Sequence, residues 1–350
     1  MKVATLGDGG VVLADRPEPR PGPGEITVRL AACGVCGTDL EKLRGGYTAS
    51  AILGHEPVGR VAAVGEGIRG LAEGDRVFVH HHVPCRRCPT CARGDLTFCP
   101  TYARTNLDPG GFAETVRVSR AHVEAGAVLR LAPSVGWDAG TLLEPAGCAV
   151  TALRRSGFAP GASVFVYGLG PAGILCARVA RALGARWVGG AEIADRRRRV
   201  ALAGGIDVAV DPRIDGAVRA AVDGATGGEG VDLAIVATGA PSAAAEAVAV
   251  ARRAGTVNLF GVPPKGSRLE ADLQSVYLRG VRIVPSYATG EEEIREVHDL
   301  LVSGRLSLDD LVTDRVPLAR AAEAFATAAD AARSVKVVVT GPAYGTVDSA

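Results

Sequence analysis

The sequence predicts an α/β protein with two domains, an N-terminal β domain and a domain built on a doubly wound parallel sheet. A chain of 350 residues is long for one domain and ordinary for two. Up to about residue 145, short apolar runs such as EITVRLAAC are separated by Gly and Pro, which is typical of strands and loops. Beyond about residue 150, strand-like apolar runs alternate with segments of helical spacing, which indicates parallel strands joined by helices.

Composition narrows the class of protein. Hydrophobic residues make up 47% of the chain and charged residues 22%, as in an ordinary globular protein. The net charge of +1, without a basic stripe, argues against nucleic acid as the main partner. The N-terminus lacks the apolar run of a signal peptide, and no segment is apolar enough to span a bilayer. With clustered cysteines instead of a disulfide framework, these features predict a cytoplasmic protein that does not bind membranes.

The second domain can be divided into individual elements. Strands are expected at residues 163–168, 186–193, 207–210, 231–238, 256–261 and 281–286, with helices at 171–185 and 195–205. Two further helices at 291–306 and 318–332 and a strand at 334–341 are expected near the C-terminus. We therefore expect a β domain over 1–147, a parallel-sheet domain over 148–287 and a C-terminal segment over 288–350.

A glycine-rich turn follows the first strand of the second domain. The run Gly168-Leu-Gly170-Pro171-Ala172-Gly173 has the spacing G-x-G-x-x-G and lies between an expected strand and an expected helix. In a dinucleotide-binding turn, the first glycine allows the sharp bend, the second lets the backbone approach the phosphates, and the third lets helix and strand pack closely. The helix N-terminus then attracts the pyrophosphate. A plain glycine turn is the alternative, but the context favours a dinucleotide site.

Glu192 lies at the end of the next expected strand. An acid at that point can accept both hydroxyls of an adenosine ribose and favours NAD over NADP. The run from Arg196 to Arg199 is a competing signal, because one or two of its guanidinium groups could instead hold a ribose 2′-phosphate. Only four of the 39 basic residues are lysines, so the run is better interpreted as a solvated helix face in an arginine-rich chain. We expect NAD, with NADP as the alternative.

Four cysteines lie close together in the first half of the chain. Their spacing, C-x2-C-x2-C-x7-C, comprises Cys85, Cys88, Cys91 and Cys99. Four thiolates close the tetrahedral shell of a structural zinc ion and leave no coordination position for a substrate. An iron–sulfur cluster or unligated cysteines are the alternatives. A catalytic metal ion would therefore need a different site.

Separate segments contain candidate ligands for such an open site. CGVCGTD contains Cys36, GHEPVG contains His55 and Glu56, and LLEPAGCAV contains Glu144. A cysteine, a histidine and a carboxylate, with water at the remaining position, suit a catalytic zinc ion. Each of the four can also be an ordinary polar residue, and spacing alone does not show that they converge. Cys148 is an alternative to Glu144 as a ligand.

In chain order, CGVCGTD, GHEPVGRVAAVGEG, the four-cysteine segment and the Gly168–Gly173 turn resemble the zinc-dependent medium-chain dehydrogenase/reductase family over nearly the whole chain. The resemblance implies a GroES-like β catalytic domain with a structural zinc lobe at about 83–101, a Rossmann domain and an active site between them. It implies one structural zinc on the four cysteines and one catalytic zinc on Cys36 and His55, with Glu56 as a ligand or exchanging with water. Glu144 is similar to a glutamate of the sorbitol, threonine and polyol dehydrogenases that touches the zinc or its water.

The same resemblance implies further site residues. Thr38 stands where the family has a Ser or Thr that relays a proton from the substrate oxygen. Asp39 can orient a metal-binding histidine, or it can be a turn or helix-cap residue. Lys336 stands where the family often has a basic residue for the pyrophosphate. The remaining expected cofactor contacts are Arg197, Thr238 and Val262.

Three adjacent histidines precede the first cysteine of the lobe. A strand through VFVHHH would place His81 on the opposite face from His80 and His82, so that either His81 or His82 reaches the substrate. Further candidates for substrate contact, chosen by their segments, are Arg44, Tyr47 and Asn106.

The expected activity is hydride transfer between NAD(P) and a secondary alcohol of a polyol, sugar, cyclitol or amino alcohol, with zinc polarising the substrate oxygen. One alternative is an NADPH-preferring ketone reductase of a biosynthetic pathway. The other is a non-catalytic nucleotide-binding protein, which is disfavoured because all the candidate zinc ligands are present. The expected partners are a small hydroxylated substrate and further copies of the chain in a dimer or tetramer.

Overall fold

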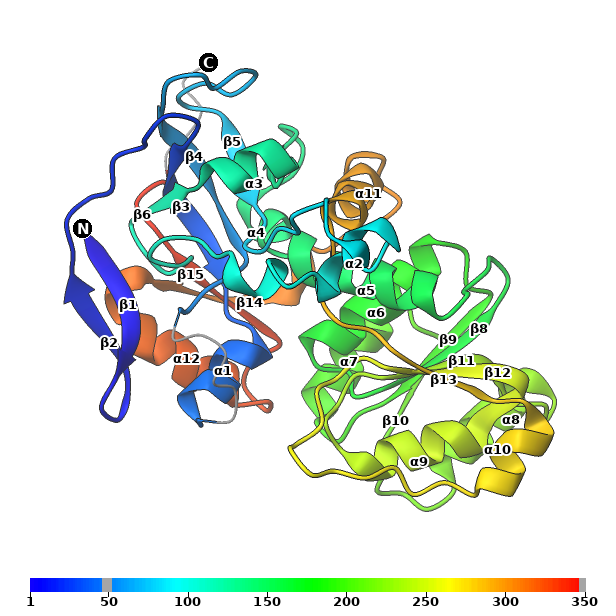
Figure 1. Ribbon diagram of the computed structural model, residues 1–350. Helices are drawn as coiled ribbons and strands as arrows, with labels where there is room; N and C mark the ends of the chain where they lie inside the picture. Colours follow the sequence, from blue (N-terminus) through cyan, green and yellow to red (C-terminus); the bar gives the residue numbers. More distant parts are fainter. Residues whose placement is uncertain (46–51, 346–350) are drawn as a thin grey trace. The chain divides into compact units, whose positions relative to one another are not determined.

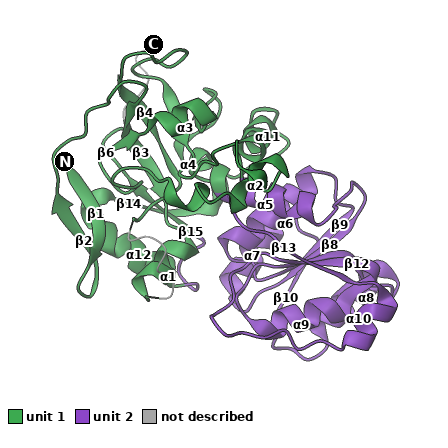
Figure 2. Cartoon of the chain, in the orientation of Figure 1, with its two compact units in different colours: residues 1–144, 290–330, 336–350 green, residues 145–289, 331–335 purple. Residues whose placement is uncertain are grey.

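The computed structural model describes residues 1–45 and 52–345, and these form two compact units. The first unit comprises Met1–Glu144, Gly290–Asp330 and Lys336–Ala350, and the second comprises Pro145–Thr289 with Ala331–Val335, as coloured in Figure 2. The second unit is thus almost one continuous stretch of sequence, whereas the first is completed by the C-terminal part of the chain. The expectation for Tyr47 lies outside the described residues.

A seven-stranded sheet forms the centre of the first unit. Its order is β14 (Val312–Pro317), β15 (Lys336–Thr340), β3 (Ile26–Gly34), β4 (Pro57–Val64), β5 (Arg76–Val79) and β7 (Val128–Arg130), with β6 (Thr115–Val118) also paired to β3. All these pairs are antiparallel except β14 with β15. A separate hairpin, β1 (Lys2–Gly7) and β2 (Gly10–Asp15), precedes the sheet. Strand β3 is buried at all but one of its residues, and three strands pair with it.

The first unit is a β domain as expected, and short helices that the sequence did not predict interrupt its strands. They are α1 (Gly37–Leu43), α2 (Pro89–Ala92), α3 (Arg120–Ala125) and α4 (Trp137–Thr141), and the C-terminal part adds α11 (Glu291–Val302) and α12 (Ala321–Ala329) (Figure 1). The first four span no more than seven residues each. Two turns of helix are too short to give a recognisable period of apolar residues.

A six-stranded, entirely parallel sheet forms the second unit. Its order is β10 (Val208–Val210), β9 (Trp187–Ala191), β8 (Ser163–Tyr167), β11 (Val231–Val236), β12 (Ala251–Leu259) and β13 (Arg282–Pro285). The expected strands and the helices α6 (Pro171–Ala182) and α7 (Asp195–Ala203) are confirmed. Helices α8 (Ala217–Thr226), α9 (Pro241–Val250) and α10 (Leu273–Arg279) complete the unit. The strand order reverses between β8 and β11, which is where ligands bind in such sheets.

Helices lie near the points where the chain passes from one unit to the other. Helix α5 (Leu143–Arg155) begins in the first unit and continues into the second. The helix expected at 291–306 is α11, and that expected at 318–332 is a short 3-10 turn (Leu318–Arg320) followed by α12. Among the described residues, no helix is both long enough and apolar enough to cross a membrane.

Candidate metal centres and nucleotide site

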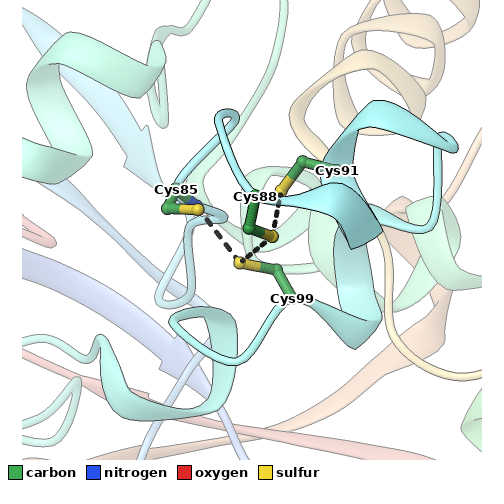
Figure 3. Close-up of side chains that lie close together, drawn as sticks. All are labelled: Cys85, Cys88, Cys91 and Cys99. Carbon is green, nitrogen blue, oxygen red and sulfur yellow. Dashed lines mark hydrogen bonds between the residues drawn. The ribbon is translucent and has the colours of Figure 1, made fainter.

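The four cysteines of the lobe converge in the first unit. Their ligand atoms all lie within 4.8 Å of one another, and none of the four forms a disulfide (Figure 3). The sulfur–sulfur distances are 3.5 Å from Cys88 to Cys91 and 3.8 Å from Cys88 to Cys99. A zinc ion with bonds of about 2.3 Å to sulfur has tetrahedral edges of about 3.8 Å, so this spacing fits zinc. It is much too long for a disulfide.

Backbone groups prepare one of these thiols for metal binding. Burial raises the pKa of Cys99, but the backbone N–H groups of Cys85 and Thr101 donate to its sulfur at 3.4 Å and lower that pKa to about 6. Burial instead raises the pKa of the Cys91 thiol to about 12. A metal ion must therefore displace a proton from Cys91, whereas Cys99 already favours the thiolate.

Cys36, His55 and Glu56 form a second group of possible ligands, which we call the Cys–His–Glu group. One ligand atom from each lies within 4.8 Å of the others. Cys36 caps helix α1 just after β3, while His55 and Glu56 immediately precede β4. The pairing of β3 with β4 brings these separate segments together, which the sequence spacing could not show.

Asp39 and Thr38 contact this group from helix α1. Asp39 is fully buried; its carboxylate accepts backbone N–H groups from Cys36 and Gly54 and lies 3.5 Å from Nδ1 of His55. Burial disfavours the Asp39 carboxylate, but the adjacent His55 ring and these donors hold its pKa below the usual value. Both expected roles of Asp39, helix cap and histidine partner, are present. The Thr38 hydroxyl lies 3.4 Å from Nε2 of His55.

Glu56 is paired with Lys336, the first residue of β15. The Lys336 ammonium lies 2.5 Å from Oε2 of Glu56, and the two side chains are 3% and 0% exposed. Burial raises the pKa of Glu56, although Lys336 opposes that shift. Gly34 makes room for the pair, because a Cβ there would lie 1.7 Å from the Glu56 carboxylate. The Lys336 ammonium therefore forms an ion pair with Glu56. The expected contact of Lys336 with the pyrophosphate stays a prediction.

Glu144 groups with the histidines and not directly with the Cys–His–Glu group. Its carboxylate and one nitrogen each from His80 and His81 lie within 4.8 Å of one another, and all three side chains are buried. The His81 and His55 rings are 5.0 Å apart, so the two groups are neighbours. The role of Glu144 as a ligand of the catalytic zinc stays a prediction. Cys148 belongs to the second unit.

The expected alternation of the three histidines was wrong. Strand β5 ends at Val79, so strand geometry does not apply to His80, His81 and His82. Burial lowers the pKa of His81 well below its usual value, and lowers that of His82 to about 4. Nδ1 of His82 is in very close contact with the Thr105 carbonyl. His81 is thus the histidine that borders His55.

The glycine turn of the second unit has the geometry of a phosphate-binding loop. Gly168 follows β8 with a φ of +85°, a value that favours glycine, and Gly170 caps helix α6, which begins at Pro171. A Cβ on Gly173 would lie 1.8 Å from the Gly168 carbonyl oxygen. The predicted strand–turn–helix context is confirmed, with Ala172 in the first turn of the helix.

Glu192 follows β9 and is 7% exposed, with Oε1 accepting the backbone N–H of Ala194 at 2.9 Å. The arginine run divides between two tasks. Arg198 donates to the Glu192 carbonyl at 2.6 Å and pairs with Asp211 at 3.4 Å. Arg197 instead lies close to Gly170, because a Cβ on Gly170 would be 3.5 Å from the Arg197 guanidinium.

Two other expected cofactor residues lie at the same edge of the sheet. Thr238 follows β11 and lies beside Gly168, since a Cβ added to Gly168 would be 3.1 Å from the Thr238 side chain. Val262 follows β12, and its side chain is 65% exposed. The carboxyl ends of parallel strands β8, β11 and β12 therefore gather these residues.

Sequence reasoning missed two residues that support the histidines. Glu291, the first residue of α11, lies 3.7 Å from Nδ1 of His80 and 2.6 Å from Arg86. His122 lies 2.9 Å from the His81 carbonyl. Neither has a sequence signal, since Glu291 begins an ordinary acidic helix turn. Of the expected substrate contacts, Arg44 is exposed and pairs with Glu41, and Asn106 accepts the Leu107 N–H.

Comparison with known proteins identifies the class. Residues 22–128 match the alcohol dehydrogenase GroES-like domain, and residues 171–303 match the zinc-binding dehydrogenase domain. An L-threonine 3-dehydrogenase of Pyrococcus abyssi is 33% identical over 317 residues, covering 87% of this chain and 88% of that protein. A Neosartorya fischeri protein named "Probable D-xylulose reductase A" is 29% identical, covering 95% and 94%. A Sinorhizobium meliloti structure, described as a zinc-binding dehydrogenase bound to NADP, is 30% identical, with a TM-score of 0.86 and coverage of 97% and 98%.

The fold and the site define a zinc-dependent dehydrogenase with a GroES-like and a Rossmann part. The chain belongs to the zinc-dependent medium-chain dehydrogenase family, in the branch of the threonine and polyol dehydrogenases. It is an oxidoreductase that uses zinc and NAD(P).

Proposed function

We propose that this enzyme transfers hydride between NAD and a secondary alcohol of a hydroxylated small molecule: a polyol, sugar, cyclitol or amino alcohol. The observation that carries the proposal is the Cys–His–Glu group, which combines a thiol, an imidazole and a buried carboxylate within 4.8 Å. The similar proteins named for threonine and xylulose support the substrate class.

The catalytic zinc is proposed to bind Cys36, His55 and Glu144, with Glu56 as a further ligand that can exchange with water and so leave an open position. The fit is chemical: Oε1 of Glu56 is buried and accepts no hydrogen bond from any described residue, while Oε2 faces the Lys336 ammonium. Such a donor set with an open position suits catalytic zinc. When bound, zinc polarises the substrate oxygen. Cys85, Cys88, Cys91 and Cys99 are proposed to hold the structural zinc.

This chain's own residues orient the site and move the proton. Asp39 holds the His55 ring through Nδ1, which leaves Nε2 directed to the other side of the ring. The Thr38 hydroxyl, close to that nitrogen and half-buried, can pass a proton between the substrate oxygen and solvent. Lys336 favours the ionised form of Glu56 and so opposes the rise in pKa that burial causes.

The cofactor is proposed to bind the Gly168–Gly173 turn of the second unit, with Glu192 accepting the ribose hydroxyls. The buried Glu192 carboxylate would repel a 2′-phosphate, which supports NAD. Arg197 is proposed to contact a phosphate of the cofactor, and its closeness to Gly170 supports this. We further propose that the enzyme acts in the cytoplasm as a homo-oligomer of two or four chains, without nucleic acid or membrane partners.

A reduced-cofactor absorbance assay on the zinc-loaded enzyme tests the function. NAD and NADP are each paired with polyols, sugars, cyclitols, amino alcohols and simple primary alcohols. We expect turnover of a hydroxylated secondary alcohol with NAD, abolished in Cys36→Ser. Turnover with NADP alone would instead favour an NADPH-linked ketone reductase, in line with the NADP-bound relative. Binding of both cofactors without turnover of any substrate would overturn the substrate class.

A further inference from the structure

We propose that His80, His81 and Glu144 form a second site for a divalent transition-metal ion, beside the Cys–His–Glu group. We call it the His–His–Glu site. It goes beyond the proposed dehydrogenase function, which needs only one catalytic and one structural ion. The ions it suits are zinc and close relatives such as cobalt, which bind imidazole nitrogen and carboxylate oxygen.

The first argument is the geometry of the donor atoms. Two imidazole nitrogens and one carboxylate oxygen lie within 4.8 Å of one another. The exposed fractions are 1% for His80, 9% for His81 and 6% for Glu144. Burial of a carboxylate and two imidazoles is costly, and a cation held between the three would stabilise the arrangement.

The second argument is an unpartnered ring nitrogen on His81. Nδ1 of His81 is buried, and no described residue forms a hydrogen bond with it. More than nine-tenths of buried polar groups in proteins are paired, so this atom calls for an explanation. On His80, Nε2 is the nitrogen proposed to face the ion, and it has a long contact, 3.5 Å, with the Tyr102 hydroxyl.

The third argument is a supporting layer around the histidines. Metal-binding histidines usually direct their other ring nitrogen at a carboxylate. Oε1 of Glu291 lies 3.7 Å from Nδ1 of His80, and its other oxygen is fixed by Arg86 at 2.6 Å. Arg86 is itself part of the cysteine lobe, so a folded lobe helps to position His80.

The backbone of the second histidine is also fixed. Nε2 of His122 lies 2.9 Å from the His81 carbonyl, which can only accept, so Nε2 carries the proton. Nδ1 of His122 then accepts from the Ser119 hydroxyl at 2.8 Å. This chain of hydrogen bonds leaves the His81 ring itself available to a ligand.

Glu144 can serve both groups. A carboxylate has two oxygens, so a bond from one of them to the His–His–Glu site leaves the other for the first ion. The His55 and His81 rings, 5.0 Å apart, bring the two groups close enough for a shared carboxylate. Two-metal sites with such bridging ligands stabilise charge on the oxygens of a substrate.

The test is a metal count on the full-length enzyme produced in cobalt-supplemented medium. Cobalt and sulfur are measured together by plasma mass spectrometry, so that sulfur gives the protein concentration. Cobalt bound to thiolate absorbs strongly in the near ultraviolet, whereas cobalt on nitrogen and oxygen alone does not. The cobalt count and the thiolate band therefore report different sites, and neither depends on turnover.

Three matched variants are compared: His80→Phe, His81→Phe and, as the control, the adjacent His82→Phe. We expect His80→Phe and His81→Phe each to lose one equivalent of cobalt relative to the wild type, with the thiolate band intact. An intact band also shows that the cysteine lobe is folded. His82→Phe is expected to keep the wild-type count, and Cys36→Ser is expected to lose a different equivalent together with part of the band.

The proposal is overturned if the wild type holds no cobalt beyond that of the four cysteines and the Cys–His–Glu group. It is equally overturned if the count is unchanged in both His80→Phe and His81→Phe. Absence of turnover in the alcohol assay would argue against the proposed function alone, because the metal count does not change with it.

Discussion

Replacement of Lys336 by methionine should destabilise the first unit strongly. Methionine fills a similar volume but leaves the fully buried Glu56 carboxylate without the ammonium that now lies 2.5 Å away. Removal of one partner of a buried ion pair costs about 3–5 kcal/mol, because the remaining charge is uncompensated. Burial already raises the pKa of Glu56, and loss of Lys336 removes the first group that opposes this shift.

The chain offers a clean assay for this change. It has two tryptophans, Trp137 in the first unit and Trp187 in the second. In a Trp187→Phe background, tryptophan fluorescence during urea unfolding follows the first unit. With a urea m-value of about 2 kcal/mol per molar, the expected loss moves the midpoint down by about 1.5–2.5 M.

Two comparisons isolate the reason. Lys2→Met removes a lysine whose ion pair with Asp15, at 2.8 Å, is largely exposed, and it should leave the midpoint almost unchanged. The double variant Glu56→Gln with Lys336→Met removes both charges and should recover part of the loss. The reasoning is refuted if Lys336→Met shifts the midpoint no more than Lys2→Met does.

Four further outcomes are expected. Gly173→Ala should abolish NADH binding in a fluorescence titration, because the new Cβ would lie 1.8 Å from the Gly168 carbonyl oxygen. Gly170→Ala should weaken NADH binding without abolishing it, because the nearest atom to its Cβ would be 3.5 Å away. Equal binding by the two variants would contradict this reasoning. Glu192→Ser should raise the NADP-to-NAD ratio of kcat/KM by about tenfold, by loss of charge repulsion and of the ribose hydrogen bonds; an unchanged ratio would exclude Glu192 as the determinant. Cys99→Ser should lower the zinc content by one equivalent, measured by plasma mass spectrometry, and a retained ion would show that the lobe does not need all its sulfurs. Burial lowers the pKa of His82 from 6.5 to about 4, so as the pH falls from 6.5 to 4 the unfolded chain binds this proton and the folded chain does not. The free energy of unfolding should therefore fall over this range by at most on the order of 3 kcal/mol. In His82→Phe, urea unfolding at a series of pH values should show that this part of the loss is absent.

The elements that could be predicted are those with a strong local signal. The strands of the second unit are runs of buried apolar residues, and the turn at Gly168 depends on Gly168, with its φ of +85°, and on Gly173, where a Cβ would clash. The spacing of the four cysteines likewise predicts their convergence, because all lie in one short segment.

The elements that could not be predicted depend on contacts between distant segments. The partner of Glu56 is Lys336, 280 residues further along the chain (336 − 56), which only the pairing of β15 with β3 explains. A strand through VFVHHH is expected from the sequence, but β5 ends at Val79, where its partner β7 begins at Val128. Glu291 has no local mark that separates it from the two glutamates that follow it.

The position of β15 in the first unit has a consequence for the order in which the chain matures. The second unit is nearly continuous, so it can fold while the remainder is still being synthesised. The first unit must wait for residues 336–340, because β3 lacks one of its partners and Glu56 lacks its lysine until the last strand emerges. A chain that stopped before residue 336 would contain the nucleotide domain, but β3 and Glu56 would still lack these two partners. Completion of the first unit, and with it of the proposed metal site, is therefore a late event in synthesis.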